Sequence, residues 1–197
     1  YDQIYDEHAF YFSVHSVQTL VAKHDLEVVD VLSQNVHGGS MRYVIGHKGA
    51  RPASERVVAQ KRKEDALGLH KRETYAGFKK AVERSRDDLM KLLRDLKKQG
   101  QRVVAYGATS KSTTVTNYCG ITPDLVQAIS DTTPIKQGKY SPGAHIPIIS
   151  YEEFTKNRPK YSLLFAWNHG QEIMDKEVEF RNQGGKFILY VPNVHVR

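Results

Sequence analysis

The sequence has very little cysteine and no long apolar segment. Cys119 is the only cysteine among 197 residues, which excludes an internal disulfide and a cysteine-based zinc site within these residues. No apolar run approaches the roughly 20 residues that a membrane helix needs, and we expect no signal peptide. We therefore predict a cytoplasmic protein that has no membrane partner.

Several catalytic motifs are also absent. The nine histidines show no metal-ligand spacing. We find no serine nucleophile elbow and no carboxylate pair placed for glycoside chemistry. The turn over residues 107–112, Gly-Ala-Thr-Ser-Lys-Ser, matches neither G-x-G-x-x-G nor the P-loop. We expect no metal ligand in this chain.

The apolar content of 40% is enough for a packed core. In residues 1–50 the pattern predicts a helix over 17–23 behind Ser16 with Leu20 facing inward, a strand over 26–32, a turn over 37–40, and a second strand over 41–45 paired back on the first. This order is typical of the end of a class I methyltransferase domain.

Residues 51–100 are charged and helical, with residues 51–54 as a linker and Ser54 as an N-cap. They hold 15 Lys or Arg and 8 Asp or Glu, which is the whole of the formal +7 charge. Apolar residues from Tyr75 and Phe78 to Leu96 recur at helical spacing. A solvated amphipathic helix is favoured over a nucleic-acid surface, because acidic residues are interleaved and no nucleic-acid motif is present.

Residues 101–197 alternate strand and helix. The predicted elements are strands over 102–106, 125–130, 161–167 and 187–191, a helix that follows the turn over 107–112 and runs through Tyr118 to Gly120, and a helix from 171 to 183. The pattern predicts an α/β fold with a doubly wound, Rossmann-like parallel sheet. We therefore divide the chain at residues 50 and 100.

The first candidate for chemistry is Tyr5-Asp6-Glu7-His8. Histidine suits proton transfer near neutral pH, and a nearby carboxylate can orient it. In a strand Glu7 and His8 would face opposite ways and Tyr5 would share the face of Glu7, whereas in a loop Glu7 can pair with either His8 or Tyr5. An active site so near the first residue suggests that the chain is the back portion of a longer enzyme.

The second candidate is the carboxyl edge of the predicted sheet. Ser110 and Lys111 open a helix directly after a strand, where backbone N–H groups can bind an anion, and Lys111 is expected at the solvent edge. Asp131 ends the next strand, where dinucleotide folds hold a ribose. The loop 131–147 adds Lys136 and His145, and Asn168 follows a third strand. An ordinary capped helix and a rigid connection are the alternative interpretations.

Six blocks in order carry a family resemblance: residues 1–8 (YDQIYDEH), 37–40 (HGGS), 106–111 (YGATSK), 117–121 (NYCGI), 142–147 (PGAHIP) and 167–169 (WNH). Together they resemble the back half of SAM-dependent sugar C-methyltransferases that act at C3 of TDP-linked 4-keto-deoxysugars. The resemblance implies a SAM-binding domain and a zinc-binding N-terminal domain ahead of this chain, with no zinc in the chain itself. It also implies a C-terminal Rossmann-like domain that does not use NAD.

The family's Tyr-x-Glu-His motif matches Tyr5, Glu7 and His8, so the resemblance implies that His8 is the base that removes the C3 proton. It implies sugar-nucleotide contacts at residues Ser110, Lys111, Lys136, His145 and Asn168. The fragment alone is then expected to be inactive, with a TDP-sugar as substrate and no nucleic-acid partner, and the oligomeric state is left open. A non-catalytic nucleotide-sugar or protein-binding module and an NAD-dependent oxidoreductase domain are the alternatives.

Overall fold

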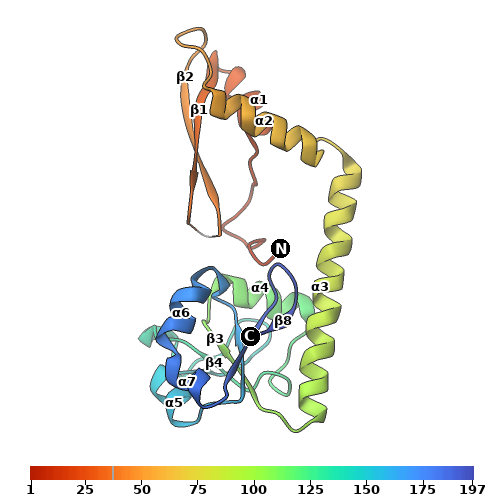
Figure 1. The fold of residues 1–197 in the computed structure, drawn as a ribbon, viewed down its shortest axis with the longest axis vertical. Helices are drawn as coiled ribbons and strands as arrows, with labels where there is room; N and C mark the ends of the chain where they lie inside the picture. Colours follow the sequence, from red (N-terminus) through yellow and green to blue (C-terminus); the bar gives the residue numbers. More distant parts are fainter. Residues whose placement is uncertain (37) are drawn as a thin grey trace. The chain divides into compact units, whose positions relative to one another are not determined.

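A computed structural model describes residues 1–36 and 38–197 (Figure 1). His37 of the predicted turn lies outside the described residues. The chain forms two compact units: a larger unit of residues 1–8 and 81–197, and a smaller unit of residues 9–80. The sequence-based division at residues 50 and 100 stays a prediction.

The smaller unit begins with helix α1 (Val14–Ala22), strands β1 (Leu26–Gln34) and β2 (Ser40–His47), and helix α2 (Glu55–Leu67). The two strands pair antiparallel, as predicted. The N-cap of α1 is Ser13 rather than Ser16, because the two serines form a reciprocal capping box. Leu20, predicted to face inward, is 49% exposed.

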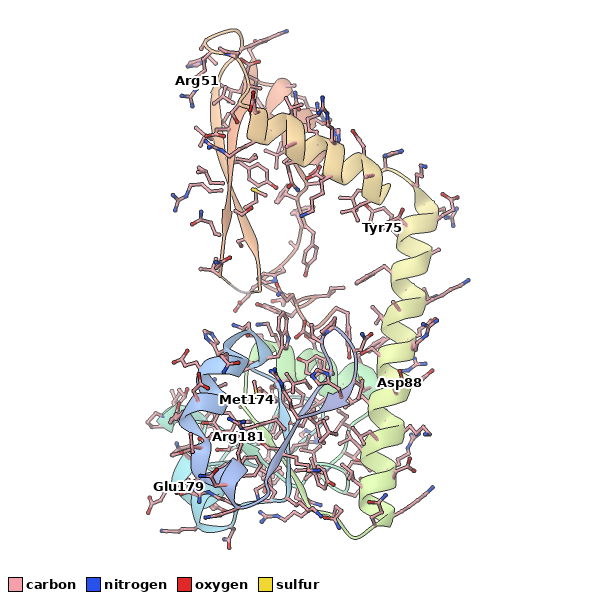
Figure 2. The ribbon with its side chains drawn as sticks, in the orientation of Figure 1. Arg51, Tyr75, Asp88, Met174, Glu179 and Arg181 are labelled. Atoms are coloured by element: carbon pink, nitrogen blue, oxygen red, sulfur yellow. The ribbon has the colours of Figure 1, made fainter. Side chains whose placement is uncertain are left out.

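Two helices occupy the charged segment. Ser54 caps α2 through a bond from the Val57 amide, as predicted, and α2 ends at Gly68 in the left-handed conformation (φ 66°). The second helix, α3 (Arg72–Lys98), begins in the smaller unit and continues into the larger one. Its apolar stripe is buried only near the C-terminal end: Tyr75 is 56% exposed (Figure 2), whereas Leu93 is fully buried. The charged side of the helix, with Asp88, is exposed.

The larger unit contains a six-stranded sheet with the order β5-β4-β3-β6-β7-β8. Its strands are β3 (Val103–Tyr106), β4 (Ile129–Ser130), β5 (Ile148–Ile149), β6 (Tyr161–Leu164), β7 (Lys186–Leu189) and β8 (His195–Val196). The first five are parallel and β8 is antiparallel. Counted along the chain this is the order 3-2-1-4-5-6 of doubly wound dinucleotide-binding folds, so the predicted α/β class is confirmed.

Helices cover both faces of this sheet (Figure 1). The strands bury alternate residues on opposite faces: Val103 packs on one side with α3 and α4 (Ser110–Cys119), and Val104 packs on the other. The second face is covered by α5 (Tyr151–Lys156), α6 (Gly170–Lys176) and α7 (Val178–Asn182). Since the helices change face between β3 and β6, the topological switch point lies at these two strands.

Three predicted elements are shorter or broken in the structure. The strand expected over 125–130 is only β4, because Leu125 and Val126 donate to the carbonyl of Thr122 in a turn. The strand expected to reach Trp167 ends at Leu164, and 3₁₀ turns occupy Pro134–Lys136 and Trp167–His169. The helix expected over 171–183 is broken at Glu177, whose buried carboxylate accepts a hydrogen bond from the Tyr106 hydroxyl.

Candidate functional site

A hollow of about 420 Å³ lies at the switch point of the sheet. Its walls come from the residues that follow the carboxyl ends of β3, β4 and β6, among them Gly107, Asp131 and Ala166. Ligands of open α/β sheets bind at this position. The fold therefore brings together three strand ends that are far apart in sequence.

Asp131 holds the two loops at this edge together. Its carboxylate accepts bonds from the amides of Ala108 (2.7 Å) and Thr133 (2.8 Å). The Lys136 ammonium lies 3.5 Å from the same carboxylate and donates to the Ala108 carbonyl at 2.7 Å. Burial alone would raise the pKa of Asp131, but these hydrogen bonds and the lysine outweigh it and lower the pKa. The residue that would hold a ribose in an NAD fold thus serves to fasten loops.

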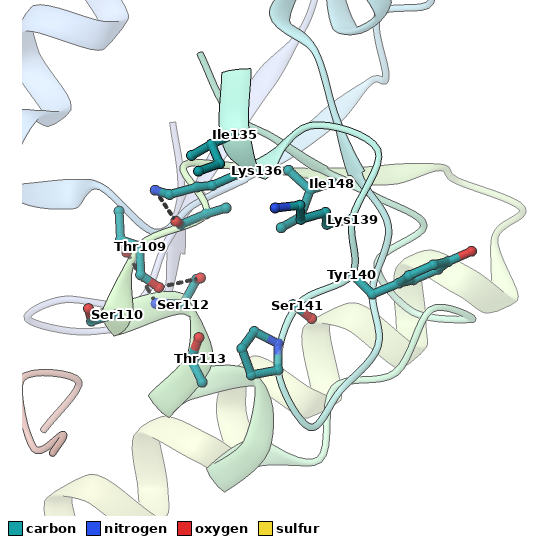
Figure 3. Close-up of a pocket in the computed structure, with 12 residues that line it drawn as sticks. Thr109, Ser110, Ser112, Thr113, Ile135, Lys136, Lys139, Tyr140, Ser141 and Ile148 are labelled. Atoms are coloured by element: carbon teal, nitrogen blue, oxygen red, sulfur yellow. Dashed lines mark hydrogen bonds between the residues drawn. The ribbon is translucent and has the colours of Figure 1, made fainter. Parts of the chain in front are cut away.

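A second hollow, of about 460 Å³, lies beside the start of α4 (Figure 3). On one side are Thr109, Ser110 and Thr113 of α4 and its N-cap, and on the other are Lys136, Lys139, Tyr140 and Ser141 of the long loop. Thr109 caps the helix by accepting from the Ser112 amide at 3.2 Å. The hollow combines a helix N-terminus, two ammonium groups and several hydroxyls, which is the chemistry that favours an anion.

Lys111 lies elsewhere than expected. It is only 8% exposed, so the expectation of a solvent-edge lysine is wrong. Its ammonium donates to the Asn168 side chain at 2.7 Å and lies 5.2 Å from the centre of the Trp167 ring. Burial lowers its pKa, while the carboxylate of Asp2 acts in the opposite direction. The predicted residues Lys111 and Asn168 are thus brought together, in contact with each other.

The first eight residues belong to the larger unit and are tied to its sheet. Asp2 is 2% exposed and accepts hydrogen bonds from the Trp167 indole (2.5 Å) and the Tyr190 hydroxyl (2.7 Å). These two donors follow the carboxyl ends of β6 and β7. The segment that carries the candidate base therefore sits at the same edge of the sheet as the predicted sugar-nucleotide residues.

Within this segment His8 is half-buried and pairs with Tyr5. The two rings lie 4.2 Å apart, because the His8 amide donates to the Tyr5 carbonyl and the chain is wound into a turn. The Nδ1 atom of His8 lies 2.8 Å from the Gln3 carbonyl oxygen, and Glu7 is exposed. A carbonyl can only accept, so Nδ1 carries the proton of the neutral ring and Nε2 is the basic nitrogen.

The remaining predicted residues separate into two groups. Ser110 and Lys136 line the hollow of Figure 3, whereas His145 is exposed in the loop beyond it with a positive φ of 51°. Sequence reasoning missed Asp2, Lys139, Tyr140 and Tyr190. Asp2 lies in residues 1–8 and Lys139 in the loop 131–147, two segments that the sequence had already marked as candidates.

The described part of the chain shows neither a metal-binding cluster nor a membrane-spanning helix. Residues 1–36 and 38–197 contain no group of three or more His, Cys, Asp or Glu side chains that could hold a metal ion. In the same residues, no helix is both long and apolar enough to span a bilayer.

Comparison with known proteins defines the class. Residues 35–192 match the model of the family described as "C-methyltransferase C-terminal domain". The chain therefore belongs to the C-methyltransferase C-terminal domain family. It is also 39% identical over 200 residues to the C-methyltransferase NovU of Streptomyces niveus. That alignment covers 100% of this chain and 47% of NovU, so the chain spans about half the length of this curated relative.

Proposed function

We propose that this chain is the carboxyl-terminal part of a SAM-dependent C-methyltransferase that acts on a TDP-linked 4-keto-deoxysugar. In this reaction the C4 ketone acidifies the proton on C3, and Nε2 of His8 removes it. The observation that carries the proposal is the location of His8: the Tyr5–His8 pair belongs to a segment fastened through Asp2 to the carboxyl edge of the sheet. This edge is where open α/β folds bind their ligands.

His8 suits the role of base on two counts. The bond from Nδ1 to the Gln3 carbonyl sets the tautomer in which Nε2 can accept a proton. The Tyr5 ring, tilted by 32° against the imidazole, holds it in place, and its hydroxyl is a donor suited to the enolate oxygen that forms at C4. Glu7, exposed beside the base, would help to orient the substrate or the base.

The nucleotide half of the substrate fits the hollow beside α4 (Figure 3). Ser110 and the first amides of α4 would face the diphosphate together with the ammonium groups of Lys136 and Lys139. Tyr140, 65% exposed at the rim, offers a flat surface on which the nucleobase can stack. Lys111, Asn168 and His145 stay predicted contacts for the sugar nucleotide. Binding energy from the nucleotide, remote from C3, helps to position the reacting carbon.

The switch point of the sheet is poorly suited to a nucleoside such as that of SAM. The glycine turn after β3 packs against its neighbour, since a Cβ on Gly107 would lie 3.1 Å from that of Ala166. Asp131, at the position that would hold a ribose, is engaged by Ala108 and Thr133. We therefore assign SAM, which supplies the methyl group that the C3 carbanion takes up, mainly to other parts of the enzyme, where the family resemblance also implies a structural zinc.

The proton-transfer role is tested with His8→Ala in the complete enzyme. We expect methyl transfer from labelled SAM to fall by about 10²–10⁴-fold, the usual contribution of a general base. TDP affinity should be unchanged, because His8 is assigned to the sugar and not to the nucleotide. The matched control is His70→Ala, which removes an exposed histidine of the smaller unit. Full turnover by His8→Ala would favour a non-catalytic binding module instead.

The nucleotide site is tested separately by titrating TDP into Lys139→Met. A lost charge-assisted hydrogen bond of about 1.5–3 kcal/mol predicts a Kd raised by roughly 10- to 100-fold. Lys156→Met is the matched control, because Lys156 is an exposed lysine paired with Glu152 on α5. Equal TDP affinity in both variants would remove the nucleotide from this hollow.

A further inference from the structure

A buried carboxylate lies six positions before the candidate base. Asp2 is 2% exposed, and both of its hydrogen bonds to side chains converge on one oxygen, Oδ2, from the Trp167 indole and the Tyr190 hydroxyl. Burying a carboxylate is costly unless donors replace its water. A buried tyrosine and a half-buried tryptophan that donate to a single oxygen therefore make a specific attachment point.

The attachment lies among groups already assigned to the substrate. Trp167 is 5.2 Å from the Lys111 ammonium, and Lys111 donates to Asn168. Tyr190 is 1% exposed; burial, and then the Asp2 carboxylate, raise the pKa of its hydroxyl, so it remains a donor. Asp2 thus joins the first residues to the strand ends that surround the proposed sugar site.

The chain between Asp2 and His8 has little freedom. Successive turn bonds run from the Ile4 amide to the Tyr1 carbonyl, from Tyr5 to Gln3, and from His8 to Tyr5. The Nδ1 bond from His8 returns to the Gln3 carbonyl, directly after Asp2. Tyr1, before Asp2, also contacts Cys119 and Tyr190. After Asp2, the contact of Ile4 is long: the Thr114 hydroxyl lies 3.5 Å from the Ile4 carbonyl oxygen. A shift at Asp2 would therefore be transmitted to the imidazole.

We propose that Asp2 is a positioning residue for proton abstraction: its carboxylate, held by Trp167 and Tyr190, sets the place of the His8 ring relative to the C3 proton. This inference rests on the proposed function and adds a residue to it. Asp2 does not touch the reacting atoms. It acts through the backbone of residues 3–8 and through the hydrogen bond between Gln3 and His8.

The test uses the complete enzyme and follows exchange of the C3 proton of the TDP-linked 4-keto-deoxysugar in D₂O by NMR, without the methyl donor. With substrate saturating, we expect Asp2→Ala to slow exchange by about 100-fold, the effect of a misplaced reacting group. TDP affinity and the pH at half-maximal exchange should not change. Asp2→Asn keeps an oxygen for both donors and should recover most of the rate. Tyr190→Phe removes one of the two donors, so its exchange rate should lie between those of Asp2→Ala and the wild type.

The His8→Ala variant distinguishes a failure of this inference from a failure of the proposed function. Loss of exchange in His8→Ala together with a wild-type rate in Asp2→Ala would overturn this inference and leave the proposed function standing. Undiminished exchange in His8→Ala would overturn the proposed function and the inference with it. Equal losses of exchange rate and TDP affinity in Asp2→Ala would show a merely structural carboxylate and also overturn the positioning role.

Discussion

Replacing Gly143 with alanine should destabilise the larger unit and deform the hollow beside α4. Gly143 has φ +75°, in the left-handed region that costs other residues roughly 1–2 kcal/mol. An added Cβ would also overlap Oδ1 of Asn117 and lie 2.8 Å from its Cγ. The loop around Gly143 contributes Ser141 and Pro142 to the wall of the hollow. A single methyl group therefore tests both the packing and the site.

The magnitude follows from what Asn117 must give up. Its Nδ2 donates to the carbonyl of Thr113 at 2.8 Å and to that of Pro142 at 3.0 Å. Each hydrogen bond contributes about 0.5–1.5 kcal/mol, and the exposure of Asn117 lets water replace part of this. With the backbone strain added, we expect the free energy of unfolding to fall by roughly 2–4 kcal/mol.

Gly138→Ala is the matched control. Gly138 has φ +74° in the same loop, but a Cβ there would meet nothing within 4 Å, so only the backbone strain applies. Urea unfolding can be followed through Trp167, the single tryptophan of the chain, which reports on the larger unit. In an Asn117→Ala background, Gly143→Ala should cost no more than Gly138→Ala. Equal stability of the two single variants would refute the steric argument.

Two other predictions concern buried carboxylates. Because the pKa of Asp131 is lowered in the folded protein, its carboxylate stabilises the fold above the ordinary pKa of 3.8, and this stabilisation is lost as the pH falls through the folded-state pKa. The Asp131→Asn variant should therefore be less stable than the wild type at neutral pH and should lose less stability in acid. Urea unfolding between pH 2 and 7 measures both effects. A parallel pH dependence for both proteins would contradict this. Glu64 is 4% exposed and accepts from the amides of Val14 and His15 at the start of α1, so Glu64→Ala should destabilise the smaller unit by about 2–4 kcal/mol, read by hydrogen exchange of the α1 amides. Unchanged protection of α1 would disprove the capping role of Glu64.

Local features of the fold could be predicted well from the sequence. The alternation of apolar strands with helices predicted the doubly wound class, and Ser54 predicted the start of α2. These features depend on neighbouring residues, through side-chain periodicity and capping. Where a second local bond competed, the prediction failed: Ser13 and Ser16 share one capping box, and the turn at Thr122 shortened β4.

The sequence by itself also marked Tyr5, Glu7 and His8 as candidates and predicted that residues after several strands share one edge. Only the tertiary structure decided which of these residues meet. Asp2 and its donors Trp167 and Tyr190 are 165 and 188 positions apart, and their contact exists because β6 and β7 are neighbours in the sheet. Likewise Lys111 looks exposed in sequence and becomes buried because the chain after β6 covers it. The order of strands, which no local pattern encodes, determines these contacts.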